Sequence, residues 1–159
     1  KPLVVNCSTR KAGFSALVSN AVADQLGGEV TTYFLSEKPD DDILETLGQA
    51  DLFVISSPIF SSDLVPSFYE FIDSISSRPA IPCVLVISCG NSGFLCSSSV
   101  RKALKRLRQV GFDPVFDVVI DHTFMLSPNE IPPKSRSKIS KLCERVLVQF
   151  LIAIVLYDG

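Results

Sequence analysis

Residues 3–15 read Leu-Val-Val-Asn-Cys-Ser-Thr-Arg-Lys-Ala-Gly-Phe-Ser, and this stretch decides the fold. It begins as a short apolar run of the kind that forms a buried β-strand, and an amphipathic segment over residues 16–26 follows it. Hydroxyl groups, an arginine and a glycine lie between the two. A strand that leads through such a loop into a helix directs backbone N–H groups and the positive end of the helix dipole at one point. The stretch therefore predicts an anion site, and a phosphate group suits it best.

The composition limits the classes of protein to consider. The chain has 159 residues, so we expect one domain over residues 1–159, whether as a whole protein or as a piece of a longer chain. Apolar residues make up 47% and charged residues 20%, a balance that excludes a disordered chain. The net charge of -2 excludes the broad basic surface of a general nucleic-acid-binding protein. The five cysteines form no Cys-x-x-Cys pair, which predicts buried, reduced thiols, no metal site and a cytoplasmic location.

Apolar runs alternate with helix-like patterns along the chain. Strands are predicted at residues 3–7, 30–35, 52–56, 84–88 and 115–120, and helices at residues 15–26, 40–47, 66–75, 98–110 and 135–152. Strands that are apolar on both faces and alternate with helices are typical of a parallel sheet covered on both sides. Right-handed crossovers then give a doubly wound, five-stranded α/β domain.

Three polar loops follow the first, third and fourth predicted strands, at residues 8–15, 56–63 and 88–94. In an open parallel sheet, ligands bind beyond the carboxyl ends of the strands, where these loops are expected to meet. Each loop alone is ordinary capping and turn chemistry. Their joint occurrence at one edge favours a binding site.

The second and third loops suit a flat ligand. Pro58 fixes a rigid turn, and Phe60 offers a planar apolar surface. Gly90 and Gly93 let the backbone come close to a ring system, with Asn91 as a hydrogen-bonding group. With the phosphate site of the first loop, the pattern predicts a phosphate-bearing cofactor or nucleotide.

Two of these motifs resemble those of a known family. Residues 7–15 resemble the Gly-Ser-Pro-Arg-Lys-x-Gly-x-Ser/Thr phosphate loop of NADPH-dependent FMN reductase-like proteins, which belong to the flavodoxin-like superfamily. Residues 50–60 are similar to the Ala-Asp…Ser-Pro-x-Tyr segment of that family. The resemblance covers roughly residues 3–120, with Cys7 in place of the usual glycine and Phe60 in place of the usual tyrosine.

The resemblance implies a flavodoxin-like fold with strand order 2-1-3-4-5 and noncovalently bound FMN. It assigns two sets of residues to FMN. The residues at the phosphate end are Ser8, Thr9, Arg10, Gly13 and Ser15. The residues at the isoalloxazine ring are Pro58, Ile59, Phe60, Gly90, Asn91 and Gly93. It implies an oxidoreductase in which NAD(P)H is the co-substrate and the electron acceptor is a flavin, a quinone or another small molecule or protein. Because the flavin carries the chemistry, no catalytic side chain is required.

Other functions stay open. The chain could be a flavodoxin-type electron carrier, or an interaction module without a cofactor that associates through residues 146–157, which are apolar except for Gln149. That tail is too short for a membrane span, whereas a core helix end, a homodimer contact or a join to a further domain all fit it. A receiver domain is excluded, because Asn6 and Cys7 stand where that class needs an acidic pair.

Two cysteines flank the third loop. Cys89 precedes it and Cys96 follows it, and nothing in the sequence pairs the two. We therefore expect packing roles for both rather than a redox partnership.

Overall fold

The computed structural model describes residues 2–8, 13–27, 31–34, 41–60, 63–75, 81–90, 94–121 and 130–157. Its strands and helices alternate in the manner predicted. In chain order they are β1 (Pro2–Asn6), α1 (Phe14–Leu26), β2 (Thr31–Phe34), α2 (Asp41–Gln49), β3 (Leu52–Phe60), β4 (Asp63–Leu64), α3 (Pro66–Ser74), β5 (Ile81–Cys89), α4 (Phe94–Gln109), β6 (Phe112–Asp121) and α5 (Pro133–Tyr157).

The sheet has the order β2-β1-β3-β5-β6, and these strands are all parallel. The predicted order 2-1-3-4-5 is not matched exactly, because the fourth strand along the chain is the short β4. It pairs antiparallel with the end of β3, Ile59 opposite Leu64 and Phe60 opposite Asp63. β5 and β6 therefore occupy the positions predicted for the fourth and fifth strands. No sequence periodicity marks β4, because two residues are too few to show one.

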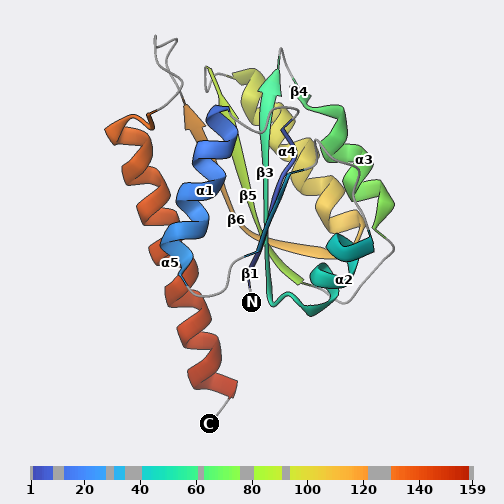
Figure 1. Ribbon diagram of the computed structural model, residues 1–159, viewed down its shortest axis with the longest axis vertical. Helices are drawn as coiled ribbons and strands as arrows, with labels where there is room; N and C mark the ends of the chain where they lie inside the picture. Colours follow the sequence, from blue (N-terminus) through green and yellow to red (C-terminus); the bar gives the residue numbers. More distant parts are fainter. Residues whose placement is uncertain are drawn as a thin grey trace.

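Helices cover both faces of the sheet (Figure 1). α1 and α5 lie on one face, where Val4 and Val54 pack against Val18. α2, α3 and α4 lie on the other face, where Phe53 stacks on Phe112 with ring centroids 4.9 Å apart. The central strands are buried on both faces, which explains why their sequences read as continuous apolar runs.

Every predicted element differs from its observed bounds by at least one residue, and three of these differences concern the candidate site or the apolar tail. β3 continues to Phe60, so residues 57–60 belong to a strand and not to the predicted loop, because β4 provides a hydrogen-bonding partner for the strand end. α4 begins at Phe94, four residues before the predicted start. α5 continues to Tyr157, so the apolar tail is helical.

A glycine ends α4. Gly111 adopts a positive φ of 99° and its N–H donates to the carbonyl oxygen of Arg108 at 3.1 Å. This left-handed conformation satisfies a carbonyl at the helix end and is one that residues with a Cβ rarely adopt. Within the part of the chain that the structure describes, no helix combines the length and the hydropathy that a membrane span requires.

Candidate functional site

The carboxyl ends of β1, β3 and β5 lie side by side at one edge of the sheet (Figure 1). The register shows this directly, since Asn6 is paired with Ser56, and Pro58 with Ser88. The structure places there the predicted site residues Ser8, Gly13, Ser15, Pro58, Ile59, Phe60 and Gly90. The predicted site residues outside the described ranges are Thr9, Arg10, Asn91 and Gly93.

Hydrogen bonds hold the end of β1 from both sides. The Cys7 N–H donates to the carbonyl oxygen of Ser56 at 2.8 Å, and the Ser67 hydroxyl of α3 donates to the Cys7 carbonyl at 2.6 Å. The next N–H, that of Ser8, donates to Oδ1 of Asn6 at 3.1 Å. A short polar side chain that accepts a bond from the backbone two residues later is typical of a tight turn. The first loop therefore leaves the sheet from a fixed starting point.

A buried polar network lies between this strand end and α1. Oδ1 of Asn6 also accepts a bond from the Ser56 hydroxyl at 3.3 Å, and the hydroxyls of Ser56 and Ser19 share a hydrogen bond of 2.5 Å. Ser19 in turn contacts the Ser15 carbonyl at 2.9 Å. All four side chains are at most 5% exposed. Buried polar groups need such partners, so the network fixes α1 against the ends of β1 and β3.

One atom of this network has no partner among the described residues. Nδ2 of Asn6 is buried and donates no hydrogen bond to any residue that the structure describes. An unpaired buried donor costs about 1–3 kcal/mol, so native proteins keep one only where something else accepts its bond. The Ser8 N–H donates to Oδ1 of Asn6. Exchanging the amide oxygen and nitrogen of Asn6 would place two donors against each other, so the unpaired atom is the nitrogen. Asn6 thus offers a donor directly before the first loop.

The N-terminus of α1 adds positive character. Gly13 is the N-cap in extended backbone conformation, φ −149° and ψ 178°, and no side chain of the described residues caps the helix. No acidic side chain lies in the first turn of α1. The dipole of this 13-residue helix is therefore not compensated locally by a carboxylate. The donors of Asn6, of the serines and of this helix end fit an anionic group such as a phosphate.

The β3–β4 hairpin is anchored beside the same edge. Asp63 accepts bonds from the Leu64 N–H at 2.8 Å, the Tyr69 hydroxyl at 3.0 Å and Nζ of Lys102 at 2.7 Å. Partial burial acts to raise the pKa of Asp63, but these hydrogen bonds outweigh it and the pKa is lowered. Burial and the bond to Asp63 raise the pKa of Tyr69, so its hydroxyl stays a donor. The cluster ties β4 to α3 and α4 and so holds the segment that carries Ile59.

Three residues of the candidate site were not predicted from the sequence: Asn6, Ser19 and Ser56. Two signals were available: an asparagine interrupts the apolar run of β1, and Ser19 follows Ser15 at the helical spacing of four residues. Ser56 gave no separate signal, because its partners depend on the register between β1 and β3.

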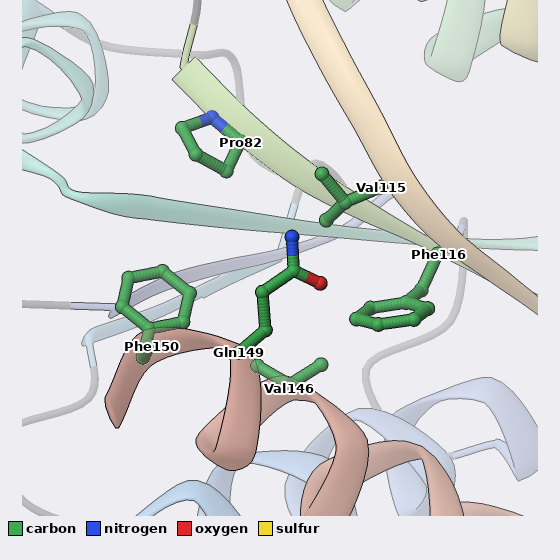
Figure 2. Close-up of a pocket in the computed structure, with 6 residues that line it drawn as sticks. All are labelled: Pro82, Val115, Phe116, Val146, Gln149 and Phe150. Atoms are coloured by element: carbon green, nitrogen blue, oxygen red, sulfur yellow. The ribbon is translucent and has the colours of Figure 1, made fainter. Parts of the chain in front are cut away.

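No group of three or more histidine, cysteine, aspartate or glutamate residues in the described ranges could hold a metal ion. An apolar pocket of about 100 Å³ lies far from the carboxyl edge, where the first residues of β5 and β6 face α5 (Figure 2). The side chain of Gln149 reaches from α5 towards the strands there. The lining residues are Pro82, Val115, Phe116, Val146, Gln149 and Phe150. None of them is a predicted site residue, so pocket and candidate site are separate.

Comparison with known proteins identifies the fold. No protein-family model and no curated protein matches this chain in sequence. The Trp repressor binding protein from Bacillus subtilis has a similar structure, with a TM-score of 0.71 and 17% identity over 89% of this chain and 99% of that chain. A flavodoxin from Streptococcus pneumoniae TIGR4 matches with a TM-score of 0.70 and 13% identity over 93% of this chain and 98% of that chain.

Flavodoxin 2 from Bacillus cereus also matches, with a TM-score of 0.69 and 18% identity over 90% of this chain and 94% of that chain. These likenesses show that the chain has a flavodoxin-like fold.

Proposed function

We propose that this protein binds FMN noncovalently at the carboxyl edge of its sheet and acts as an NAD(P)H-dependent oxidoreductase. The acceptor is a flavin, a quinone or a similar compound. The observation that carries the proposal is Nδ2 of Asn6, which is buried without a partner among the described residues at the end of the strand that leads into the first loop, in a fold that flavodoxins share.

The phosphate end of FMN would lie on the first loop. Ser8 and Ser15 supply hydroxyl groups there, Gly13 lets the chain enter α1 without a side chain in the way, and Thr9 and Arg10 complete the donor set. Charge-assisted bonds from a guanidinium to phosphate oxygens are among the stronger hydrogen bonds in proteins. Asn6 contributes in two ways, because Oδ1 fixes the turn at Ser8 and Nδ2 adds a donor.

The ring end would lie between the second and third loops. Ile59 and Phe60 belong to the hairpin that Asp63 anchors, and Gly90 follows β5 directly. Bound FMN supplies the hydride and electron chemistry, while the protein binds and orients the ring and limits its contact with water. The ring contacts proposed for these elements are those of Pro58, Ile59, Phe60, Gly90, Asn91 and Gly93.

A second function within the same fold is a flavodoxin-type electron carrier. The flavodoxins among the similar structures favour it. Both functions need FMN at the same edge, and they differ only in the turnover of NAD(P)H.

Steady-state oxidation of NADPH and NADH by the FMN-loaded protein, with a quinone as acceptor, tests the reductase. We expect a rate proportional to protein concentration and well above that of free FMN. A rate equal to that of free FMN, from protein that retains bound flavin, would contradict the reductase and leave the carrier.

A further inference from the structure

Cys89 and Cys96 form a thiol pair that the sequence did not reveal. Cys89 is the last residue of β5, and Cys96 lies in the first turn of α4. Their Sγ atoms are 3.8 Å apart, and both residues are reduced thiols. The two residues are 3% and 4% exposed. The expectation of two unrelated packing residues is therefore incomplete, because the turn between β5 and α4 brings the two sulfur atoms together.

The other three cysteines are buried as well. Burial raises the pKa of Cys7, and burial together with the charge of Asp113 raises that of Cys83 to about 12. Burial raises the pKa of Cys143 to about 11. Thiols of this kind stay protonated at neutral pH and are poor nucleophiles. Cys89 and Cys96 belong to the same core as Cys7 and Cys83, so what sets the pair apart is the 3.8 Å distance between their Sγ atoms.

We propose that Cys89 and Cys96 are a redox-active dithiol that hydrogen peroxide converts to an intramolecular disulfide. A disulfide needs an S–S distance of about 2.05 Å, so the sulfur atoms must approach by about 1.8 Å. Peroxide suits this pair because it is small enough to reach thiols that are only slightly exposed.

The reaction has two steps. One thiol, as its thiolate, attacks a peroxide oxygen, the O–O bond breaks, and a sulfenic acid and water form. The second thiol then attacks the sulfenic sulfur, the S–S bond forms, and a second water leaves. In sum, the two thiols lose two electrons and two protons, and one peroxide is reduced to two waters.

A disulfide would close a ring around residues 90–95. This segment includes Gly90, Asn91 and Gly93, which the proposed function assigns to the flavin ring. This expectation rests on the proposed function. FMN should bind more weakly to the disulfide form, because the disulfide draws together Cys89 and Cys96, which flank the segment.

Mass spectrometry of the wild-type apoprotein tests the thiol pair independently of FMN. Reduced protein is treated with a stoichiometric amount of hydrogen peroxide, alkylated and cleaved with chymotrypsin. Cleavage after Leu85 separates Cys83 from Cys89, and cleavage after Phe94 separates Cys89 from Cys96. The peptide that contains Cys89 and the peptide that contains Cys96 then stay joined only by a disulfide.

We expect the joined peptides to appear, to be two hydrogens lighter than their sum, and to separate after dithiothreitol. Cys143→Ser is the matched control and keeps this link, whereas Cys96→Ser abolishes it and leaves Cys89 open to further oxidation. Sulfinic acid without a link in the wild-type protein, a link to another cysteine, or no oxidation would overturn the proposal.

An FMN titration of the dithiol form and of the disulfide form distinguishes the redox proposal from the proposed FMN site. A disulfide form with unchanged FMN affinity refutes the coupling to the loop. A disulfide that forms in a protein without any FMN binding refutes the proposed function but confirms the dithiol.

Discussion

Asn6 is the residue on which the candidate site depends most. Its Oδ1 orients the Ser8 N–H and contacts Ser56, while its Nδ2 is buried without a described partner. A buried donor without a described partner is available to a ligand group, as the proposed function requires.

Asn6→Asp should weaken FMN binding by about 1–3 kcal/mol, or roughly fivefold to 150-fold. The change keeps an acceptor for Ser8 and Ser56 but replaces the donor with an oxygen that repels a phosphate. Flavin fluorescence titration measures the affinity. Asn20→Asp, the same change at an exposed position of α1, is the control and should leave it almost unchanged. Equal effects of the two variants would contradict a direct role of Nδ2.

Arg10→Ala should also weaken FMN binding by about 1–3 kcal/mol, the size of a charge-assisted hydrogen bond. Lys11→Ala removes the same charge from the neighbouring position and is the matched control. We expect a clearly smaller loss for Lys11→Ala in the same titration. Similar losses would show that only the overall charge of the loop matters.

Only some residues of the candidate site could be predicted from the sequence. The polar loop composition was enough to predict Ser8, Gly13 and Ser15 at one edge of the sheet. The network behind them was not predictable, because the bond between Asn6 and Ser56 joins residues 50 positions apart and exists only in one strand register.

Among the elements, the β3–β4 hairpin fixes the position of residues 59–60, which were predicted to lie in the second loop. Its anchor is Asp63, which binds Lys102 of α4 and Tyr69 of α3. The antiparallel pair extends β3 to Phe60, where the sequence predicted a turn around Pro58. A two-residue strand has no pattern of its own, so only the pairing reveals it.

Asp63→Asn should lower the free energy of unfolding at pH 7 by about 1 kcal/mol or less, because the side chains of Lys102 and Asp63 are 61% and 42% exposed. The folded pKa of Asp63 is lowered from its ordinary value of 3.8, so its ion pair stabilises the protein above that pH. The contribution is lost as the pH falls through the lower folded pKa. Urea unfolding of wild type and variant should therefore differ at pH 7, and the difference should begin to shrink as the pH falls below about 3.8.

Asp73→Asn is the control for this hairpin. Asp73 pairs with Arg106 and also joins α3 to α4, but it lies outside the hairpin. Only Asp63→Asn should reduce FMN affinity. A loss of affinity in both variants would assign the effect to the packing of α3 on α4 in general.

At the scale of the whole molecule, α5 has two different halves. Ile139 and Leu142 pack in the core with α1, whereas Leu151 and Val155 are 62% and 73% exposed. The C-terminal end of the helix extends past the sheet (Figure 1). The sequence predicted the alternation of strands and helices and the two-sided cover of the sheet. It did not predict the length of α5, because an apolar run fits a core helix and an exposed helix end equally well.

Ile139→Ala should lower the free energy of unfolding by about 2–5 kcal/mol, since it removes a fully buried side chain from the core. Val155→Ala, at an exposed position of the same helix, should change it by about 0.5 kcal/mol or less. Chemical denaturation of both variants gives the comparison. A large loss for Val155→Ala would show that the exposed end of α5 is covered in solution.

Titration of FMN with the purified wild-type apoprotein, followed by the fluorescence of the flavin, tests the central claim most directly. We expect saturable quenching with one FMN bound per chain, weakened by Asn6→Asp and not by Asn20→Asp. A protein that is folded by circular dichroism and leaves the flavin fluorescence unchanged would contradict the account.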